Sequence, residues 1–197
     1  MNYLYFERVF KQFGIVSVSQ VRATKLVFDK NNFGRWEKQG LLIKLRNGYY
    51  AFADIAATKG FAHYAAGKIY KPSYISLQTA LAFHGIIPEA TNEITSVSSL
   101  KTSTFENSLG TFSYKKIKPS LMFGYNAVEK NGFTFFMASP EKAILDLLYL
   151  EPYYNLKKEI KNLRLDWKKL TVFAKKFEKK VILEKIALLK EIFLEDI

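Results

Sequence analysis

Apolar positions near the N-terminus recur at almost helical spacing, with charged residues between them. The pattern takes in five residues: Leu4, Phe6, Val9, Phe10 and Phe13. It predicts an amphipathic first helix that ends at Gly14. The next stretch, IVSVSQVRATKL, predicts a short second helix that begins at Ser17 or Ser19, because either hydroxyl can accept a hydrogen bond from a free N–H of the first turn.

A third short helix is predicted in the segment DKNNFGRWEKQG. Asp29 can cap its start, and Gly40 suits the left-handed residue that commonly follows a helix. Phe33 and Trp36 supply its apolar stripe. Gly34 lies inside this helix, where glycine costs about 1 kcal/mol relative to alanine. The missing side chain would permit a close approach to the helix backbone.

The segment IKLRNGYYAF predicts a β-hairpin, because Asn47-Gly48 suits a two-residue type I′ turn with positive φ at both central residues. That loop predicts four cross-strand pairs: Arg46–Tyr49, Leu45–Tyr50, Lys44–Ala51 and Ile43–Phe52. One face of the hairpin is then apolar and suited to a core: Ile43, Leu45, Tyr50 and Phe52. The other face is expected to be basic and exposed: Lys44, Arg46, Tyr49 and Ala51.

The order of these elements indicates the fold class. Three short helices followed by a basic hairpin predict a winged helix-turn-helix over residues 1–54. Residues 55–71 are rich in alanine and predict a connecting helix or linker. Residues 72–197 predict a mixed α/β second domain with a helical, Lys-rich C-terminal segment, so the expected fold class is α+β.

The second domain shows clear local signals. Strands are expected in the segments EITSVSS, GTFSYKKI and YNAVEKNGFTFFMA, the last with a second Asn-Gly hairpin at residues 131–132. A helix is expected to begin after Ser139, whose hydroxyl can cap it while Pro140 takes the first helical position. Two or three amphipathic helices are expected after Tyr154.

Charge and composition bear on the partners of the protein. The chain has 197 residues and a formal net charge of +12, and it contains no cysteine. A strongly basic balance favours nucleic acid or another polyanion as a partner. The N-terminus lacks the features of a signal peptide, and no apolar run approaches the ~20 residues of a membrane span. We therefore expect a cytoplasmic protein without a membrane partner.

The sequence contains no recognisable catalytic or metal-binding pattern. Its two histidines, His63 and His84, lie in different segments without a metal-ligand spacing. Glu141 and Asp146 are five residues apart on one helix, which places them on different faces. Glycine-rich phosphate loops and nucleophile turns are missing. We expect no enzyme activity, no cofactor, no metal and no catalytic residue.

The candidate DNA contacts lie in the second helix, the third helix and the hairpin. The third helix offers Lys30, Asn31, Asn32, Arg35 and Lys38. Asparagine and arginine suit the bidentate reading of adenine and guanine edges. The hairpin offers Lys44, Arg46 and Asn47 for a phosphate or a minor groove. The second helix offers Arg22 and Lys25 as phosphate ligands.

Several motifs resemble those of a known family. The segment FGRWEKQGLLIKLRNGYYAF is similar to the helix-to-wing junction of the AbiEi-type antitoxins, the transcriptional regulators of type IV toxin–antitoxin systems. SYISLQTALAFHGIIPE and MASPEKAILDLLYL resemble blocks of that family's second domain, in the same order and at similar spacing. The resemblance covers most of the chain, and the Lys-rich end is the least similar part.

This resemblance implies a function in phage defence by abortive infection. Proteins of the family repress their own promoter by binding inverted repeats in double-stranded operator DNA through the N-terminal domain. Their C-terminal domain is needed to counteract a nucleotidyltransferase-like toxin, typically without a stable complex. The resemblance thus implies an antitoxin and autorepressor whose functional partner is such a toxin.

Alternative functions stay open at this point. The chain could be a stand-alone winged-helix regulator whose second domain senses a ligand or dimerises. A more distant alternative is an enzyme with a nucleic-acid-binding front end, which would require a deep pocket with convergent ionisable groups in residues 72–150. The Lys-rich C-terminal helices could present a plain solvated face or a second surface for a polyanion or a partner.

Overall fold

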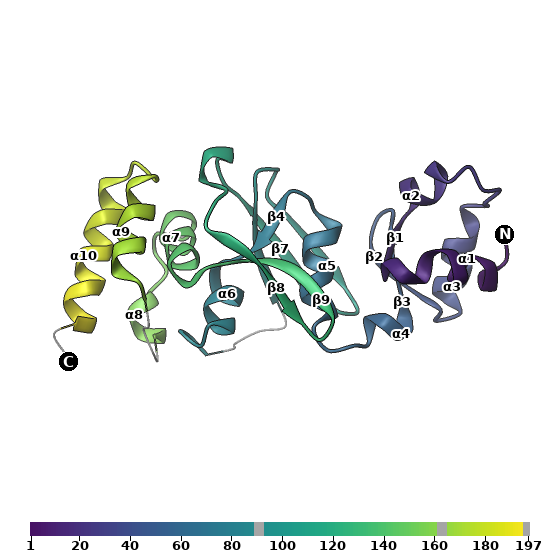
Figure 1. Ribbon diagram of the computed structural model, residues 1–197, viewed down its shortest axis with the longest axis horizontal. Coiled ribbons are helices and arrows are strands. Elements are labelled where there is room, and N and C mark those ends of the chain that lie inside the picture. The colour runs from purple at the N-terminus through teal and green to yellow at the C-terminus, as the bar shows by residue number, and fades with distance from the viewer. Residues whose placement is uncertain (89–92, 161–164, 195–197) are drawn as a thin grey trace.

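The computed structural model describes residues 1–88, 93–160 and 165–194. It has an α+β architecture with N-terminal helices on a small three-stranded sheet, a six-stranded mixed sheet, and C-terminal helices. Figure 1 shows these three parts in a row along the long axis, with the N-terminal part (purple) and the C-terminal helices (yellow) at opposite ends. We call the first part, residues 1–52, the N-terminal unit, and the part with the six-stranded sheet the sheet unit.

The N-terminal unit consists of short helices and short strands. Its elements are α1 (Tyr3–Phe10), the 3-10 helix η1 (Lys11–Phe13), β1 (Ile15–Ser17), α2 (Val18–Ala23), α3 (Asn31–Lys38), β2 (Leu42–Arg46) and β3 (Tyr49–Phe52). The strands form an antiparallel sheet in the order β1-β3-β2. The sequence did not predict β1, which is only three residues long.

Local signals placed the helices of this unit correctly. The Ser17 hydroxyl accepts a hydrogen bond from the N–H of Gln20 at the start of α2, and the Asp29 carboxylate accepts one from the N–H of Asn31 at the start of α3. Gly40 has a φ of 71°, as its predicted role after the third helix requires.

The predicted apolar stripe of α1 is partly wrong. Leu4 and Phe13 are 75% and 44% exposed, whereas Phe6 and Phe10 are buried. The Phe6 ring contacts several other aromatic rings, including that of Trp36 at a centroid distance of 4.7 Å. The core of the unit forms where α1 packs on α3 and β3, so only one edge of the predicted stripe is covered.

The predicted register of the β2–β3 hairpin is wrong beyond its first pair. The observed pairs are Arg46–Tyr49, Lys44–Tyr50, Ile43–Ala51 and Leu42–Phe52, with a β-bulge between Lys44 and Arg46. Gly48 has a φ of 80°, but Asn47 does not have a positive φ, so the turn is not type I′. The bulge allows Leu45 and Arg46 to face the same side.

Both faces of this hairpin are covered, which explains the different register. Leu42 and Phe52 belong to the core of the N-terminal unit, whereas Leu45 and Ala51 belong to the core of the sheet unit. Ala51, predicted to be exposed, is fully buried. A period of two assigns one buried face to a strand, so the pattern could not show that a second unit covers the other face.

The sheet unit begins with two helices, its six strands follow with α6 after the first of them, and it ends with α7. Its elements are α4 (Ala53–Ala56), α5 (Phe61–Ile69), β4 (Ser73–Ile75), α6 (Leu77–Phe83), β5 (Glu93–Ser98), β6 (Ser103–Asn107), β7 (Gly110–Lys116), the 3-10 helix η2 (Pro119–Leu121), β8 (Tyr125–Lys130), β9 (Phe133–Ala138) and α7 (Pro140–Leu150). The strand order is β6-β7-β5-β4-β9-β8. The pairs β5–β7 and β4–β9 are parallel and the others antiparallel.

Several predictions for this unit are confirmed. Ser139 caps α7 and Pro140 is its first residue. Asn131 and Gly132, at the predicted second hairpin, both have positive φ. The sequence did not predict β6. The predicted connecting segment, 55–71, contributes helix α5, and its Phe61 and Ile69 are fully buried in the core of the sheet unit.

The C-terminal helices are α8 (Leu156–Glu159), α9 (Trp167–Lys175) and α10 (Lys180–Leu194). Helices α9 and α10 pack on each other and on α7 (Figure 1). Their buried residues follow the predicted amphipathic pattern: Leu170, Ala174, Phe177, Ile182, Ile186 and Leu189. None of the helices in the described ranges is both long and apolar enough to cross a membrane.

Candidate nucleic-acid interface

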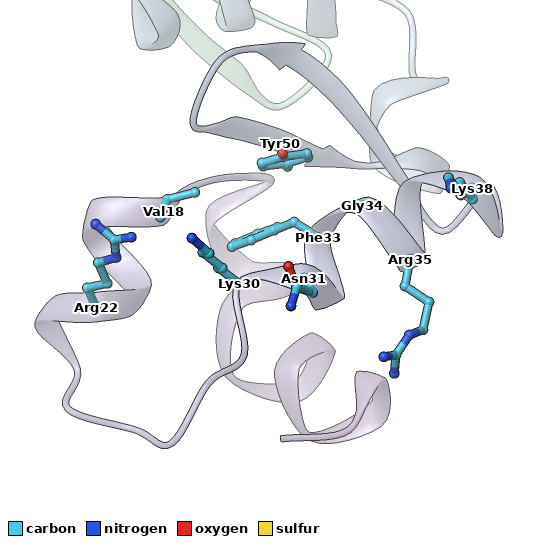
Figure 2. Close-up of a pocket in the computed structure, with 9 residues that line it drawn as sticks. All are labelled: Val18, Arg22, Lys30, Asn31, Phe33, Gly34, Arg35, Lys38 and Tyr50. Atoms are coloured by element: carbon cyan, nitrogen blue, oxygen red, sulfur yellow. The ribbon is translucent and has the colours of Figure 1, made fainter.

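A groove of about 660 Å³ runs along the N-terminal unit between α2, α3 and β3. Its lining residues are Val18, Arg22, Lys30, Asn31, Phe33, Gly34, Arg35, Lys38 and Tyr50 (Figure 2). Five of the ten candidate DNA contacts are among them. None of the lining residues is acidic, so the charged side chains of the lining are all positive.

Two stacked aromatic rings form the floor of the groove. Phe33 of α3 and Tyr50 of β3 lie with ring centroids 4.4 Å apart and planes inclined by 15°. Phe33 is buried, because its ring also belongs to the core of the unit. Burial, with a smaller contribution from Glu37, raises the pKa of Tyr50 above its ordinary value.

Helix α3 sets the direction of the polar side chains around this floor. Lys30 and Asn31 stand at its start, and Lys38 at its end, two turns away. Figure 2 shows the Lys30 side chain extending toward α2, where Arg22 projects from the neighbouring helix, and Arg35 pointing away from Tyr50. The lining thus has a lysine at each end of α3, Lys30 and Lys38, and the amide of Asn31 lies next to Lys30.

Two other candidates from this region do not line the groove. Asn32 is only 6% exposed, and its amide donates a hydrogen bond to the backbone oxygen of Met1 at 3.3 Å. Its position is four residues before Trp36 on the inward side of α3, so its side chain is not on the surface. Lys25 is exposed in the turn after α2, where it has a φ of 57°.

The three hairpin candidates line a different cleft. This cleft, of about 920 Å³, lies between the edge strands β2 and β6, and Lys44, Arg46 and Asn47 are among its lining residues. Lys44 also shares a face of the hairpin with its partner Tyr50, the floor of the first groove. Lys44 and Asn47 are exposed.

The Arg46 guanidinium packs among aromatic rings. Its central carbon lies 4.4 Å from the Tyr49 ring centre, 5.2 Å from that of Phe105 and 5.9 Å from that of Tyr70. Its buried Nε has no hydrogen-bond partner among the described residues. Nearby, the Asn107 amide donates to the Leu45 carbonyl at 2.9 Å. Sequence reasoning missed this contact, because it depends on β6, which was not predicted.

A second polar cluster lies inside the sheet unit. Lys142 and Asp146, one turn apart on α7, form an ion pair, and Asp146 also accepts hydrogen bonds from the hydroxyls of Tyr74 and Ser76. Burial lowers the pKa of Lys142, and its pairing with Asp146 opposes that effect. Neither charged side chain has exposed surface, so the cluster is a buried structural network that no ligand reaches.

The two histidines are held by neighbouring groups of the sheet unit. The His84 Nε2 lies 2.9 Å from the Ala138 carbonyl, and the His63 ring stacks on Phe135 at 5.3 Å. Within residues 1–88, 93–160 and 165–194, no three His, Asp or Glu side chains are grouped so that they could hold a metal ion.

Comparisons with models of known protein families and with curated proteins find no match to this chain.

Proposed function

We propose that the N-terminal unit is a winged helix-turn-helix and that the protein binds double-stranded DNA through the α2–α3 groove. In such a unit the third helix enters the major groove, and the hairpin lies beside it as the wing. The observation that carries this proposal is that Arg22, Lys30, Asn31, Arg35 and Lys38 all line one groove without an acidic lining residue.

The contacts divide by chemistry. Asn31 and Arg35 are the candidates for base edges, because an amide and a guanidinium can each form two hydrogen bonds to one base. Arg22, Lys30 and Lys38 are the candidates for phosphates, which fix the position of the helix without reading sequence. Their contribution is electrostatic. It should decrease as the salt concentration rises, because the phosphate contacts release counterions from the duplex.

The wing contributes through fewer residues than its composition suggests. Lys44 is exposed on the same face as Tyr50, so it is the wing residue best placed to reach a phosphate beside the groove. Arg46 packs on rings of the sheet unit, and Asn47 lies in the turn of the hairpin. Of these three, we assign the phosphate contact to Lys44.

In the cell, we propose that the protein is an AbiEi-type antitoxin and autorepressor. This step is supported by the motifs in FGRWEKQGLLIKLRNGYYAF and MASPEKAILDLLYL. The operator would be inverted repeats in its own promoter, and the functional partner a nucleotidyltransferase-like toxin. The sheet unit and the C-terminal helices would supply the neutralising function.

One observation favours a second candidate function. The wing packs against β6 through Arg46 and Phe105, so a change in the sheet unit could alter the DNA-binding surface. A stand-alone regulator whose second domain senses a ligand or dimerises would use such a contact to control DNA binding.

The first experiment is a fluorescence-anisotropy titration of the protein against its upstream DNA and a scrambled duplex of equal length, at two salt concentrations. Arg35→Ala should cost about 1–3 kcal/mol on upstream DNA and relax the preference over scrambled DNA. Lys44→Ala should weaken both duplexes alike and reduce the salt slope by about one. Lys118→Ala, an exposed lysine of the sheet unit, is the control.

The outcomes separate the proposals. Equal, weak binding of both duplexes that disappears with salt would mean that the net charge provides only a general attraction to polyanions. Wild-type affinity and preference in Arg35→Ala would show that α3 is not the recognition helix. Co-expression with the neighbouring gene tests the antitoxin function: relief of toxicity supports it, and a harmless neighbour favours the stand-alone regulator.

A further inference from the structure

Gly34 occupies an unusual position in the α2–α3 groove. It is the fourth residue of α3, it is exposed, and it lines the groove. Apart from its chain neighbours and the adjacent backbone of its own helix, a Cβ atom added at Gly34 would meet no atom within 4 Å. Its φ is not positive, so the helical backbone itself does not require glycine.

The fold therefore gives no internal reason for glycine at this position. The eight glycines with a positive φ have one, whereas Gly67 in α5 shares the situation of Gly34. Gly124 has a φ of 72°, and a Cβ there would lie 2.8 Å from the Phe173 ring; Gly40 has a φ of 71°. At Gly34, alanine would fit the backbone and would favour the helix, because it loses less conformational freedom on folding.

The surroundings of Gly34 show what the missing side chain leaves open. Lys30 lies one turn before it and Lys38 one turn after it on the same stripe of α3, and both line the groove with Gly34. Asn31 and Arg35 flank it on the adjoining stripe. The centre of the cationic surface is thus bare helix backbone, with longer polar side chains on either side (Figure 2).

We infer that Gly34 is the point of closest approach between α3 and duplex DNA. This inference rests on the proposed DNA binding and refines it. Without a side chain at residue 34, a base edge or a sugar–phosphate segment can come into van der Waals contact with the helix backbone. A methyl group there would hold α3 away from the duplex and lengthen the hydrogen bonds of Asn31 and Arg35, which weaken steeply with distance and misalignment.

The test compares Gly34→Ala with Gly67→Ala. Gly67 is also inside a helix, α5, has no positive φ, and a Cβ there would likewise meet nothing within 4 Å. Alanine should raise the melting temperature of both variants by about 2–4 °C. Only Gly34→Ala should weaken binding to the upstream duplex, by about tenfold, the loss typical of one misplaced base contact. A variant that is more stable and yet binds DNA less well is the expected signature.

The scrambled duplex identifies which part of the DNA approaches Gly34. A larger loss on upstream DNA than on scrambled DNA indicates a base edge, and an equal loss on both indicates the sugar–phosphate backbone. Unchanged or tighter binding by Gly34→Ala would overturn the inference while leaving the proposed function intact. The binding of the wild-type protein is measured first. If it fails to bind duplex DNA, the proposed function is wrong.

Discussion

The guanidinium carbon of Arg46 lies 5.2 Å from the centre of the Phe105 ring, and this contact joins the β2–β3 hairpin to the edge strand β6. Tyr49 and Tyr70 add two more rings around the same cation. The hairpin is therefore held from both sides, by the helices of the N-terminal unit and by the sheet unit. In the proposed complex, its position relative to DNA would depend on both.

Replacing Arg46 should cost stability more than it costs DNA affinity. Cation–π contacts are worth about 0.5–2 kcal/mol each, and the three rings share one cation, so Arg46→Ala should lower the free energy of unfolding by about 1–2 kcal/mol. Urea denaturation measures that loss, and the anisotropy titration measures affinity. Lys44→Ala is the matched hairpin comparison, which should lose affinity rather than stability. An unchanged unfolding free energy together with a loss of DNA affinity as large as that of Arg35→Ala would show that Arg46 contacts DNA instead.

The N-terminal unit should not fold well as an isolated fragment of residues 1–54. Cutting there would uncover Ile15, Leu45 and Ala51, which the sheet unit buries in the whole protein. We expect the fragment to aggregate, or to bind the dye ANS, which fluorescence detects. We also expect it to melt without cooperativity when circular dichroism follows the transition.

A fragment carrying Ile15→Ser and Leu45→Ser is the control for that experiment. It should be more soluble than the unmodified fragment, because both changes remove apolar surface that lost its cover. A sharply melting, monomeric fragment of the natural sequence would contradict the idea that the hairpin needs the sheet unit.

The buried pair Lys142–Asp146 should be strongly coupled. Asp146→Asn leaves the Lys142 ammonium buried without a counter-charge and should destabilise the protein by about 3–5 kcal/mol. Adding Lys142→Met should recover much of that loss, because the remaining amide can still accept from Tyr74 and Ser76. A double-mutant cycle in urea gives the coupling free energy. Strictly additive losses would show that the two charges do not stabilise each other.

Glu141 should make stability depend on pH. Burial raises its pKa, but hydrogen bonds from Lys169, from Ser139 and from backbone N–H groups outweigh burial, so the pKa lies below its ordinary value of 4.5. A carboxyl whose pKa is lower in the folded state stabilises the protein above pH 4.5, and this contribution is lost as the pH falls through the folded pKa.

Glu141→Gln should therefore be less stable than the wild type at neutral pH, by about 1–3 kcal/mol, and the difference should shrink below about pH 4.5. Urea denaturation over that pH range measures both effects. Glu129→Gln, at an exposed strand position, is the control and should stay near the wild type throughout. A difference that stays constant down to the acid end would show that the charge of Glu141 is not the cause.

Local chemistry made part of the fold predictable. The caps at Ser17 and Ser139 and the turn at Asn131-Gly132 each depend on residues a few positions apart, and the structure confirms them. Asp29 accepts a hydrogen bond from the first N–H of α3, but Lys30 occupies the N-cap position. Strands β1 and β6 were missed because each is short and has no strong turn signal of its own. Their identity as strands depends on pairing with β3 and β7.

The candidate groove was predictable to a similar degree. Helical periodicity placed Lys30, Arg35 and Lys38 off the Phe33–Trp36 stripe, and the structure brings these three together with Arg22 and Asn31. The same spacing favours an inward Asn32, four residues before the buried Trp36, and the candidate list overlooked it. Only the structure shows its partner, the backbone oxygen of Met1, which accepts its hydrogen bond.

The sequence by itself determined the α+β class, the helix starts, the position of the hairpin and the stripe of cations on α3, because these follow from spacings within one element. Only the tertiary structure decided the register of the hairpin and the surroundings of Arg46. Both depend on β6 and α5, which follow the hairpin in the chain and cover the hairpin face that its own pattern assigned to solvent. A local pattern indicates which residues are buried, but it does not indicate which other element of the fold buries them.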